Sequence, residues 1–233
     1  VSVVIGEEHF NTLRGYTYDM RVSDVASYVY PVGEDRMFHG QIETFGAEIE
    51  EIRYEVRNND GSRLIESGNV TWKEKEADVL DFTVKMKDLI VTGEEYIFTT
   101  TLTTNSHENI HYYTRFIYGN TYDLDNQLAF VREYDENTFH KEKVSEIAPY
   151  METDRSRDNS SLAHVDIHSS SKQIVWGDLP VQRVKEPDVY ITFLQDNYGA
   201  YTLDYYVSST VNDTMEYYHV VENFLVSTYG EKM

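Results

Sequence analysis

The first half of the chain has the hydrophobic pattern of β-strands. Apolar and polar residues alternate with a period of two, most clearly where Leu80, Phe82 and Val84 are separated by polar neighbours. Such alternation is typical of strands with one buried face. The ranges 96–104 and 110–118 have the same character and are joined by a short polar loop, which predicts a hairpin. About seven short strands are expected before residue 120, the number found in an immunoglobulin-type sandwich.

The period changes to that of a helix between Asp123 and Met151. Leu124, Leu128 and Val131 recur at spacings of three and four residues, as one buried face of a helix would. The same spacing returns over 144–151. This segment is therefore predicted to be a helical pair.

Strand patterns resume after the helical pair. They are predicted at Ala163–His168, Gln173–Trp176, Val181–Val184, Val189–Leu194, Tyr201–Ser208 and Thr214–Val226. Helices followed by sequential strands favour an α+β unit in which the helices cover one face of an antiparallel sheet. The prediction is therefore a mainly β protein with a helical segment. Residues 1–120 would form a sandwich, and residues 121–233 the α+β domain, which we interpret as truncated at its C-terminus.

One local motif in the first half resembles a known family. Leu89, the turn residue Gly93 and Tyr96 open a predicted strand. This arrangement is similar to the tyrosine corner of fibronectin type III domains. Thr92 stands where that family usually has proline, and no tryptophan lies on the presumed second or third strand. The resemblance implies an immunoglobulin-like β-sandwich, and such sandwiches serve mostly as spacers and binding modules.

Composition narrows the classes of function. The formal net charge is −21, from 41 acidic and 20 basic residues. This charge repels phosphate backbones and anionic lipid surfaces, so neither nucleic acid nor a membrane surface is an expected partner. The chain has no cysteine, which excludes disulfides, thiolate catalysis and cysteine-based metal sites. No motif calls for a cofactor, and neither a phosphate-binding glycine loop nor a nucleophile elbow occurs.

One histidine-rich segment is a candidate metal site. On a strand, His164, Asp166 and His168 would share one face, as two imidazoles and a carboxylate do at some metal centres. A strand rises about 3.3 Å per residue, so the two histidines would lie roughly 13 Å apart at Cα. All three could reach one ion only on a bent strand. An exposed polar strand face is the alternative interpretation.

Paired tyrosines near the C-terminus are a candidate ligand-binding set. Successive strand residues point to opposite faces, so each pair, Tyr205-Tyr206 and Tyr217-Tyr218, places one ring on each side. A hairpin turning at Val211-Asn212 would set Tyr206 opposite Tyr217 and Tyr205 opposite Tyr218. Outward rings could bind a sugar or a peptide, and sheet stabilisation is the plainer interpretation.

The function expected from these observations is a non-catalytic, extracytoplasmic binding or scaffolding module of a larger cell-envelope or secreted protein. The chain starts at Val1 without methionine, and its apolar pattern runs almost to Met233. We interpret it as part of a longer chain whose missing segment carries a signal peptide or anchor, in a Gram-positive bacterium. The expected partner is a protein or a glycan. A carbohydrate-binding protein using the tyrosines and a metal-dependent hydrolase using His164, Asp166 and His168 are the alternatives.

Overall fold

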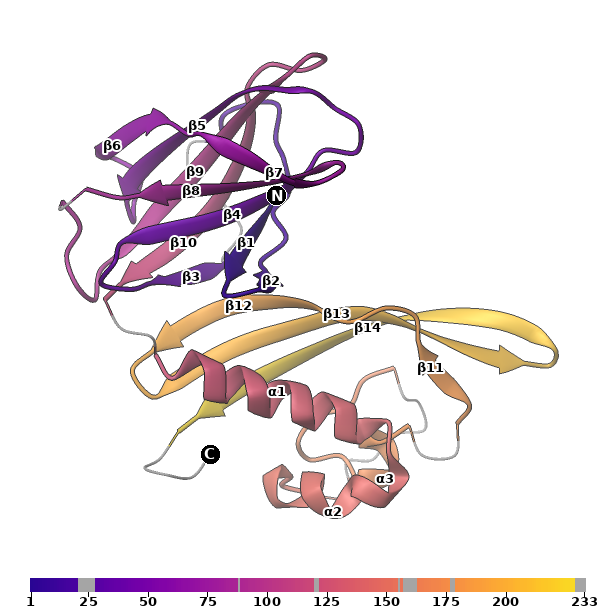
Figure 1. Ribbon diagram of the computed structural model, residues 1–233. Helices are drawn as coiled ribbons and strands as arrows, with labels where there is room; N and C mark the ends of the chain where they lie inside the picture. The colour runs from indigo at the N-terminus through magenta and orange to yellow at the C-terminus, as the bar shows by residue number, and fades with distance from the viewer. Residues whose placement is uncertain are drawn as a thin grey trace. The chain divides into compact units, whose positions relative to one another are not determined.

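The computed structural model describes residues 1–20, 28–87, 89–119, 122–154, 156, 163–176 and 179–228. The protein is mainly β with a helical segment, which confirms the predicted fold class (Figure 1). The chain forms two compact units. Unit 1 comprises 1–123, 188–203 and 223–227, and unit 2 comprises 124–187, 204–222 and 228–233. The sequence predicted one boundary near residue 120; the later segments 188–203 and 223–227 join the first unit.

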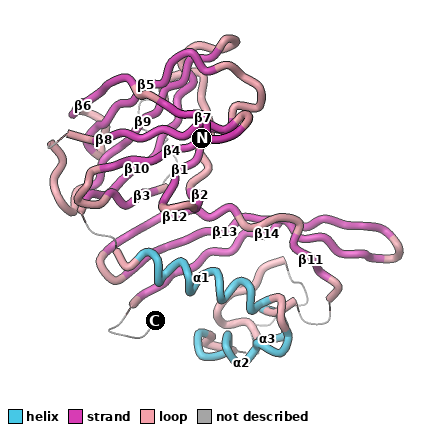
Figure 2. The backbone as a smooth tube through the Cα atoms, viewed as in Figure 1, coloured by secondary structure: helices cyan, strands magenta, loops and turns pink. Residues whose placement is uncertain are grey.

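Two five-stranded sheets make up most of unit 1 (Figure 2). The first has the order β2-β1-β4-β8-β7. Its strands are β1 Ser2–Ile5, β2 Glu8–Phe10, β4 Met37–Glu43, β7 Trp72–Glu76 and β8 Val79–Lys85. The second has the order β3-β10-β9-β5-β6, and β3 pairs with β10 in parallel. Its strands are β3 Val29–Val32, β5 Ile49–Asn58, β6 Leu64–Asn69, β9 Glu95–Thr104 and β10 Ile110–Tyr118.

The two sheets share one hydrophobic core. Phe38 of β4 and Phe98 of β9 stack with ring centroids 3.9 Å apart, and both side chains are buried. Gly40, which pairs with Phe82 across the first sheet, leaves room for that ring, because a Cβ there would collide with it. The apolar residues of the alternating pattern thus point into one layer between the two sheets. This packing is consistent with a β-sandwich.

The local geometry of the tyrosine corner is present in unit 1. The hydroxyl of Tyr96 accepts a hydrogen bond from the Val91 backbone N–H at 2.8 Å, and Gly93 has a φ of +80°. A tyrosine that bonds backbone a few residues upstream is the defining contact of such corners. The structure is thus consistent with a β-sandwich that contains this local contact.

Asn11 explains why a late segment joins unit 1. Its buried backbone N–H donates to the Val189 carbonyl at 2.9 Å, and its side-chain oxygen accepts from the Ile191 N–H at 2.7 Å. These bonds hold β12, Asp188–Gln195, against the region of β2. Buried amide groups are costly to leave unpaired, so this contact fixes the strand in place. A strand this far along the chain could not be assigned to the first unit by periodicity.

Unit 2 begins with the predicted helical segment. Helix α1 spans Leu124–Thr138, followed by a 3₁₀ turn Lys141–Lys143, a short α2 Val144–Ile147 and a second 3₁₀ turn Ala148–Tyr150. The second predicted helix is thus broken into short turns. The prediction of a strand at Gln173–Trp176 was wrong, because its first two residues end α3, Ser171–Ile174, and its last two are in neither a helix nor a strand. Strand β11 follows at Val181–Arg183.

The last three strands form a sheet with β11. Strand β13 spans Tyr198–Val211 and β14 spans Thr214–Ser227. Strand β13 lies between β11 and β12 in the sheet order, and β14 pairs with β13. Asn212 and Asp213 connect β13 to β14 with φ values of 49° and 62°. Positive φ at both central residues is the signature of the tight two-residue turn that suits twisted hairpins. Of the two strands, 204–211 and 214–222 belong to unit 2.

Candidate functional site

The β13–β14 hairpin has one face that is buried in unit 2. Exposure alternates along β13, and Tyr205 and Val207 are fully buried. The Tyr205 ring lies 6.3 Å from that of Phe139, just beyond the C-terminal end of α1. Leu124, Leu128 and Val131 are also buried and form one apolar face of α1. The inner face of the hairpin is therefore anchored by the helix.

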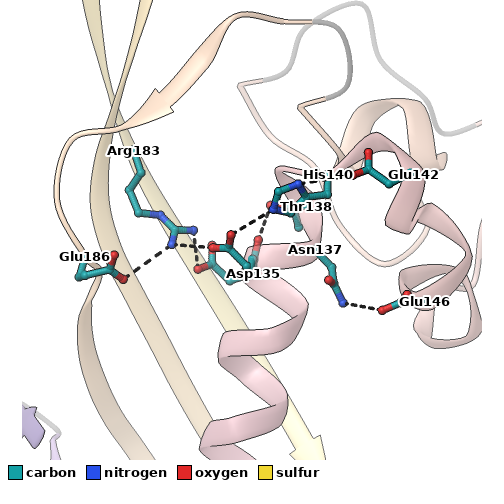
Figure 3. A network of polar contacts seen from close by, with 9 residues as sticks. Asp135, Asn137, Thr138, His140, Glu142, Glu146, Arg183 and Glu186 are labelled. Atoms are coloured by element: carbon teal, nitrogen blue, oxygen red, sulfur yellow. Dashed lines mark hydrogen bonds and ion pairs between the residues drawn. The ribbon is translucent and has the colours of Figure 1, made fainter.

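A buried ion pair forms the centre of this anchor (Figure 3). A terminal nitrogen of Arg183 lies 2.7 Å from Oδ2 of Asp135, and both side chains are largely buried. The other terminal nitrogen is 3.2 Å from Glu136. The guanidinium carbon sits 4.4 Å from the centre of the Phe139 ring and 5.1 Å from that of Tyr205. Arg183 thus ties β11 to the end of α1 by charge and by ring contact.

A second carboxyl group completes the cluster from β14. The Tyr205 hydroxyl donates to Oε1 of Glu222 at 3.1 Å. Within the described part of the chain, Oε2 of Glu222 and Oδ1 of Asp135 are buried without a hydrogen-bond partner when both groups are ionised. A proton held on Glu222 and donated to Asp135 would satisfy both oxygens at once. We name Asp135, Arg183, Tyr205 and Glu222 the acid cluster.

The electrostatics of the acid cluster agree with a shared proton. Burial, and after it the negative charge of Asp135, raise the pKa of Glu222 to about 8. Burial also raises the pKa of Asp135, against the opposing effect of Arg183. The pKa of Tyr205 is raised by burial and by both carboxyl groups, so its hydroxyl remains a donor. With one arginine for two buried carboxyls, the neutral form of Glu222 is favoured near neutral pH.

The opposite face of the hairpin is exposed. The Tyr206 ring stacks on His219 with centroids 4.8 Å apart, and Nε2 of His219 lies 2.6 Å from Oδ1 of Asp204. These contacts cross from β13 to β14 and fix which residues share the face. Alternation then places Met215, Tyr217 and Val221 beside His219. We call the following residues the outer face: Asp204, Tyr206, Met215, Tyr217, His219 and Val221.

Large apolar groups dominate the outer face. Met215, Tyr217 and Val221 are each at least half exposed, with Tyr217 at 65%. Toward the turn, residues 214–219 are exposed on both sides of the strand. In Figure 1 this end of the hairpin extends well past β11. Unit 2 thus carries a row of exposed apolar side chains on a projecting hairpin.

The predicted tyrosine set is divided by the structure. Tyr205 is buried in the acid cluster, while Tyr206, Tyr217 and Tyr218 are exposed. The predicted pairing of Tyr206 with Tyr217 and of Tyr205 with Tyr218 was wrong, because the turn lies at Asn212-Asp213, one position later than assumed. That shift brings His219, and not Tyr217, to Tyr206.

Tyr218 lies on the other side of β14. Its hydroxyl donates to the carboxylate of Glu216, and this hydrogen bond raises the Tyr218 pKa. Tyr206 and Tyr217 are thus the two tyrosines of the predicted set that share the outer face.

The predicted metal set does not lie on a strand. Residues 164–166 have no regular secondary structure and residues 167–168 lie in a turn, where the His168 N–H donates to Oδ1 of Asp166 at 2.9 Å. The His168 ring nitrogen Nδ1 lies 3.2 Å from the Glu152 carbonyl. Among the described residues, no group of three or more histidine, aspartate or glutamate side chains is arranged to hold a metal ion. The prediction of a strand here was wrong. Metal binding by His164, Asp166 and His168 stays a prediction, and it no longer has the support of a shared strand face.

The acid cluster was not predicted from the sequence. Asp135 follows Leu128 and Val131 on the apolar face of α1, where an acidic residue is out of place. Glu222 likewise lies on the same side of β14 as the buried Val226. An acidic residue in phase with a buried face was the available signal, since such groups are rarely buried without a partner.

Comparisons with known proteins identify no family. No protein-family model matches the chain, and no curated protein matches it. A solved structure, the crystal structure of CopC from Methylosinus trichosporium OB3b, aligns with 46% of this chain and 94% of its own length. Its TM-score is 0.29 and its sequence identity is 12%. Within the described residues, no helix is long and apolar enough to cross a membrane.

Proposed function

We propose that this protein is a non-catalytic binding module that contacts a protein partner through the outer face of the β13–β14 hairpin. We also propose that it acts outside the cytoplasm, as part of a larger envelope or secreted protein. The observation that carries the proposal is the row formed by Met215, Tyr217 and Val221, exposed on a hairpin whose other face is anchored by the acid cluster. Exposed apolar groups on a rigid support are the usual form of a protein-binding surface.

The stacked Tyr206 and His219 support the same proposal. Aromatic side chains give a large contact area at low cost in conformational entropy, and the stack holds both rings in place. The pair between His219 and Asp204 restricts the imidazole further. A partner would therefore meet a surface that is already ordered, which favours affinity. A sugar-binding surface would use the same rings and is the alternative.

Selection of displayed peptides tests the proposal. A random peptide library is selected on the intact chain, and the enriched peptides are measured against the double variant Met215→Ser/Tyr217→Ser. We expect affinity to fall at least tenfold, because both side chains lie on the outer face. The matched control is Phe45→Ser, which removes an apolar side chain that is 84% exposed in unit 1 and should change affinity less than twofold.

Two outcomes would contradict this function. Peptides that bind the double variant as tightly as the parent would place the binding surface elsewhere. Glycan-array binding that disappears on Tyr206→Ala or Tyr217→Ala, without peptide binding, would favour the carbohydrate alternative. Circular dichroism of each variant verifies that the hairpin remains folded.

A further inference from the structure

The outer edge of β14 is open along residues 214–222. Within the described part of the chain, β14 pairs with β13 alone. An open edge presents unpaired backbone groups, and natural proteins usually block it with lysine, proline or a bulge. The sequence of this range, Thr-Met-Glu-Tyr-Tyr-His-Val-Val-Glu, contains neither lysine nor proline. Its edge therefore has the form of a template for one more strand.

The open edge and the outer face involve the same residues. In a two-residue hairpin the residues that flank the turn form a hydrogen-bonded pair, and bonded pairs then alternate along the ladder. Val211 and Thr214 flank the turn here. Met215, Tyr217, His219 and Val221 consequently direct their backbone groups to the open edge. An added strand would pair with these backbones and pack its own side chains beside the apolar row.

The charge around the edge indicates the kind of strand. No lysine or arginine occurs between Lys185 and Lys232, a range that includes the whole hairpin. The same range contains eight acidic residues. On the hairpin itself, Asp213 and Glu216 are exposed and Asp204 is partly exposed. A strand bearing lysine or arginine complements this field, whereas a second copy of the chain, with its own net charge of −21, is repelled.

We propose that the edge of β14 over residues 214–222 binds an extended, basic segment of a partner protein as an added β-strand. Backbone hydrogen bonds to Met215, Tyr217 and Val221 give the affinity, and the acidic hairpin selects the basic sequence. The inference rests on the proposed function, since it specifies the partner of the same surface. It adds that contact is made through the backbone and not through side chains alone.

A pair of synthetic peptides tests this directly. The probe is a ten-residue peptide of alternating lysine and valine, compared with an analogue that is N-methylated at every residue and so keeps the charge but has no N–H donor. We expect the analogue to bind the intact chain at least tenfold more weakly at physiological salt. Amide exchange at 215, 217, 219 and 221 should slow when the unmodified peptide is added.

A substitution on the edge strand, with a matched control on β13, provides a second test. Tyr217→Lys places on β14 the kind of residue that natural edges use, and should weaken binding at least tenfold. Thr210→Lys makes the same change of charge at an exposed residue of β13, one strand away from the open edge, and should weaken binding less than threefold.

Several results would overturn the inference. Equal affinity for the N-methylated analogue would show that contact is made by side chains only. The proposed function would still stand in that case if the Met215→Ser/Tyr217→Ser variant failed to bind the selected peptides. Equal affinity for a peptide of alternating glutamate and valine would remove the charge argument. A dimer of the chain that Tyr217→Lys dissociates would assign the edge to a second copy. No binding of the lysine–valine peptide would also refute the inference.

Discussion

Replacing Arg183 by methionine is expected to lower the free energy of unfolding of unit 2 by about 3–5 kcal/mol, as loss of one partner from a buried ion pair does. The reason is that Asp135, which is almost fully buried, loses its counter-ion, while Glu222 stays close by. Urea denaturation measures the change. The ring centroids of Trp176 and Phe139 lie 5.9 Å apart in unit 2. Trp72→Phe removes the other tryptophan, so the remaining fluorescence reports on the unfolding of unit 2.

Two further variants determine whether the charge is responsible. Asp135→Leu combined with Arg183→Met should recover most of the lost stability, because an apolar pair of similar size replaces a buried ion pair at little cost. Arg57→Met removes a more exposed arginine, paired with Glu55 at 3.0 Å, and should change stability by less than about 1 kcal/mol. A cost below about 1 kcal/mol for Arg183→Met would mean that the acid cluster does not anchor the hairpin.

Glu222→Gln is expected to change how stability depends on pH. The pKa of Glu222 is raised from 4.5 to about 8, so the folded protein holds a proton that the unfolded chain releases between these values. Stabilisation by this group is complete below pH 4.5, falls as pH rises, and is lost above pH 8. The slope is at most about 1.4 kcal/mol per pH unit. Glutamine stays neutral throughout, so the variant lacks this part of the slope.

The measurement is urea denaturation at pH 5 and pH 8 for both proteins. Between pH 5 and pH 8 the parent should lose about 2–4 kcal/mol of unfolding free energy that Glu222→Gln keeps. This range follows from the slope above acting over three pH units. Glu216→Gln is the control, because it lies on the same strand with an exposed side chain and should follow the parent. A parallel pH profile for parent and Glu222→Gln would show that Glu222 is ionised in the folded state.

Periodicity predicted the elements of this fold better than their partners. The alternation around Phe82 and the spacing of Leu124, Leu128 and Val131 identified a buried strand and α1, because each pattern reports one local face. The strand predicted at 163–168 failed for a local reason. Asp166 captures the His168 N–H through its side chain, and this bond competes with a sheet ladder.

The candidate site could be predicted only in part, because periodicity reports which face a residue is on and not which residue it contacts. Exposed Tyr206 and Tyr217 followed from alternation, but the register of the hairpin depended on which of Val211, Asn212 and Asp213 form the turn. No glycine marks that turn, so the sequence left its position open by one residue. The pairing of Asp135 with Arg183 joins residues far apart in the chain, and periodicity does not indicate such contacts.

The central claim is that the hairpin is anchored on its inner face while its outer face and the β14 edge remain open. Residue-by-residue amide hydrogen exchange along β14, measured by NMR on the protein alone, tests this most directly. We expect slow exchange at 216, 218, 220 and 222, whose amides pair with β13, and fast exchange at 215, 217, 219 and 221. Slow exchange at all of these positions would show that another strand already covers the edge, and fast exchange at all of them would show that the hairpin is not anchored.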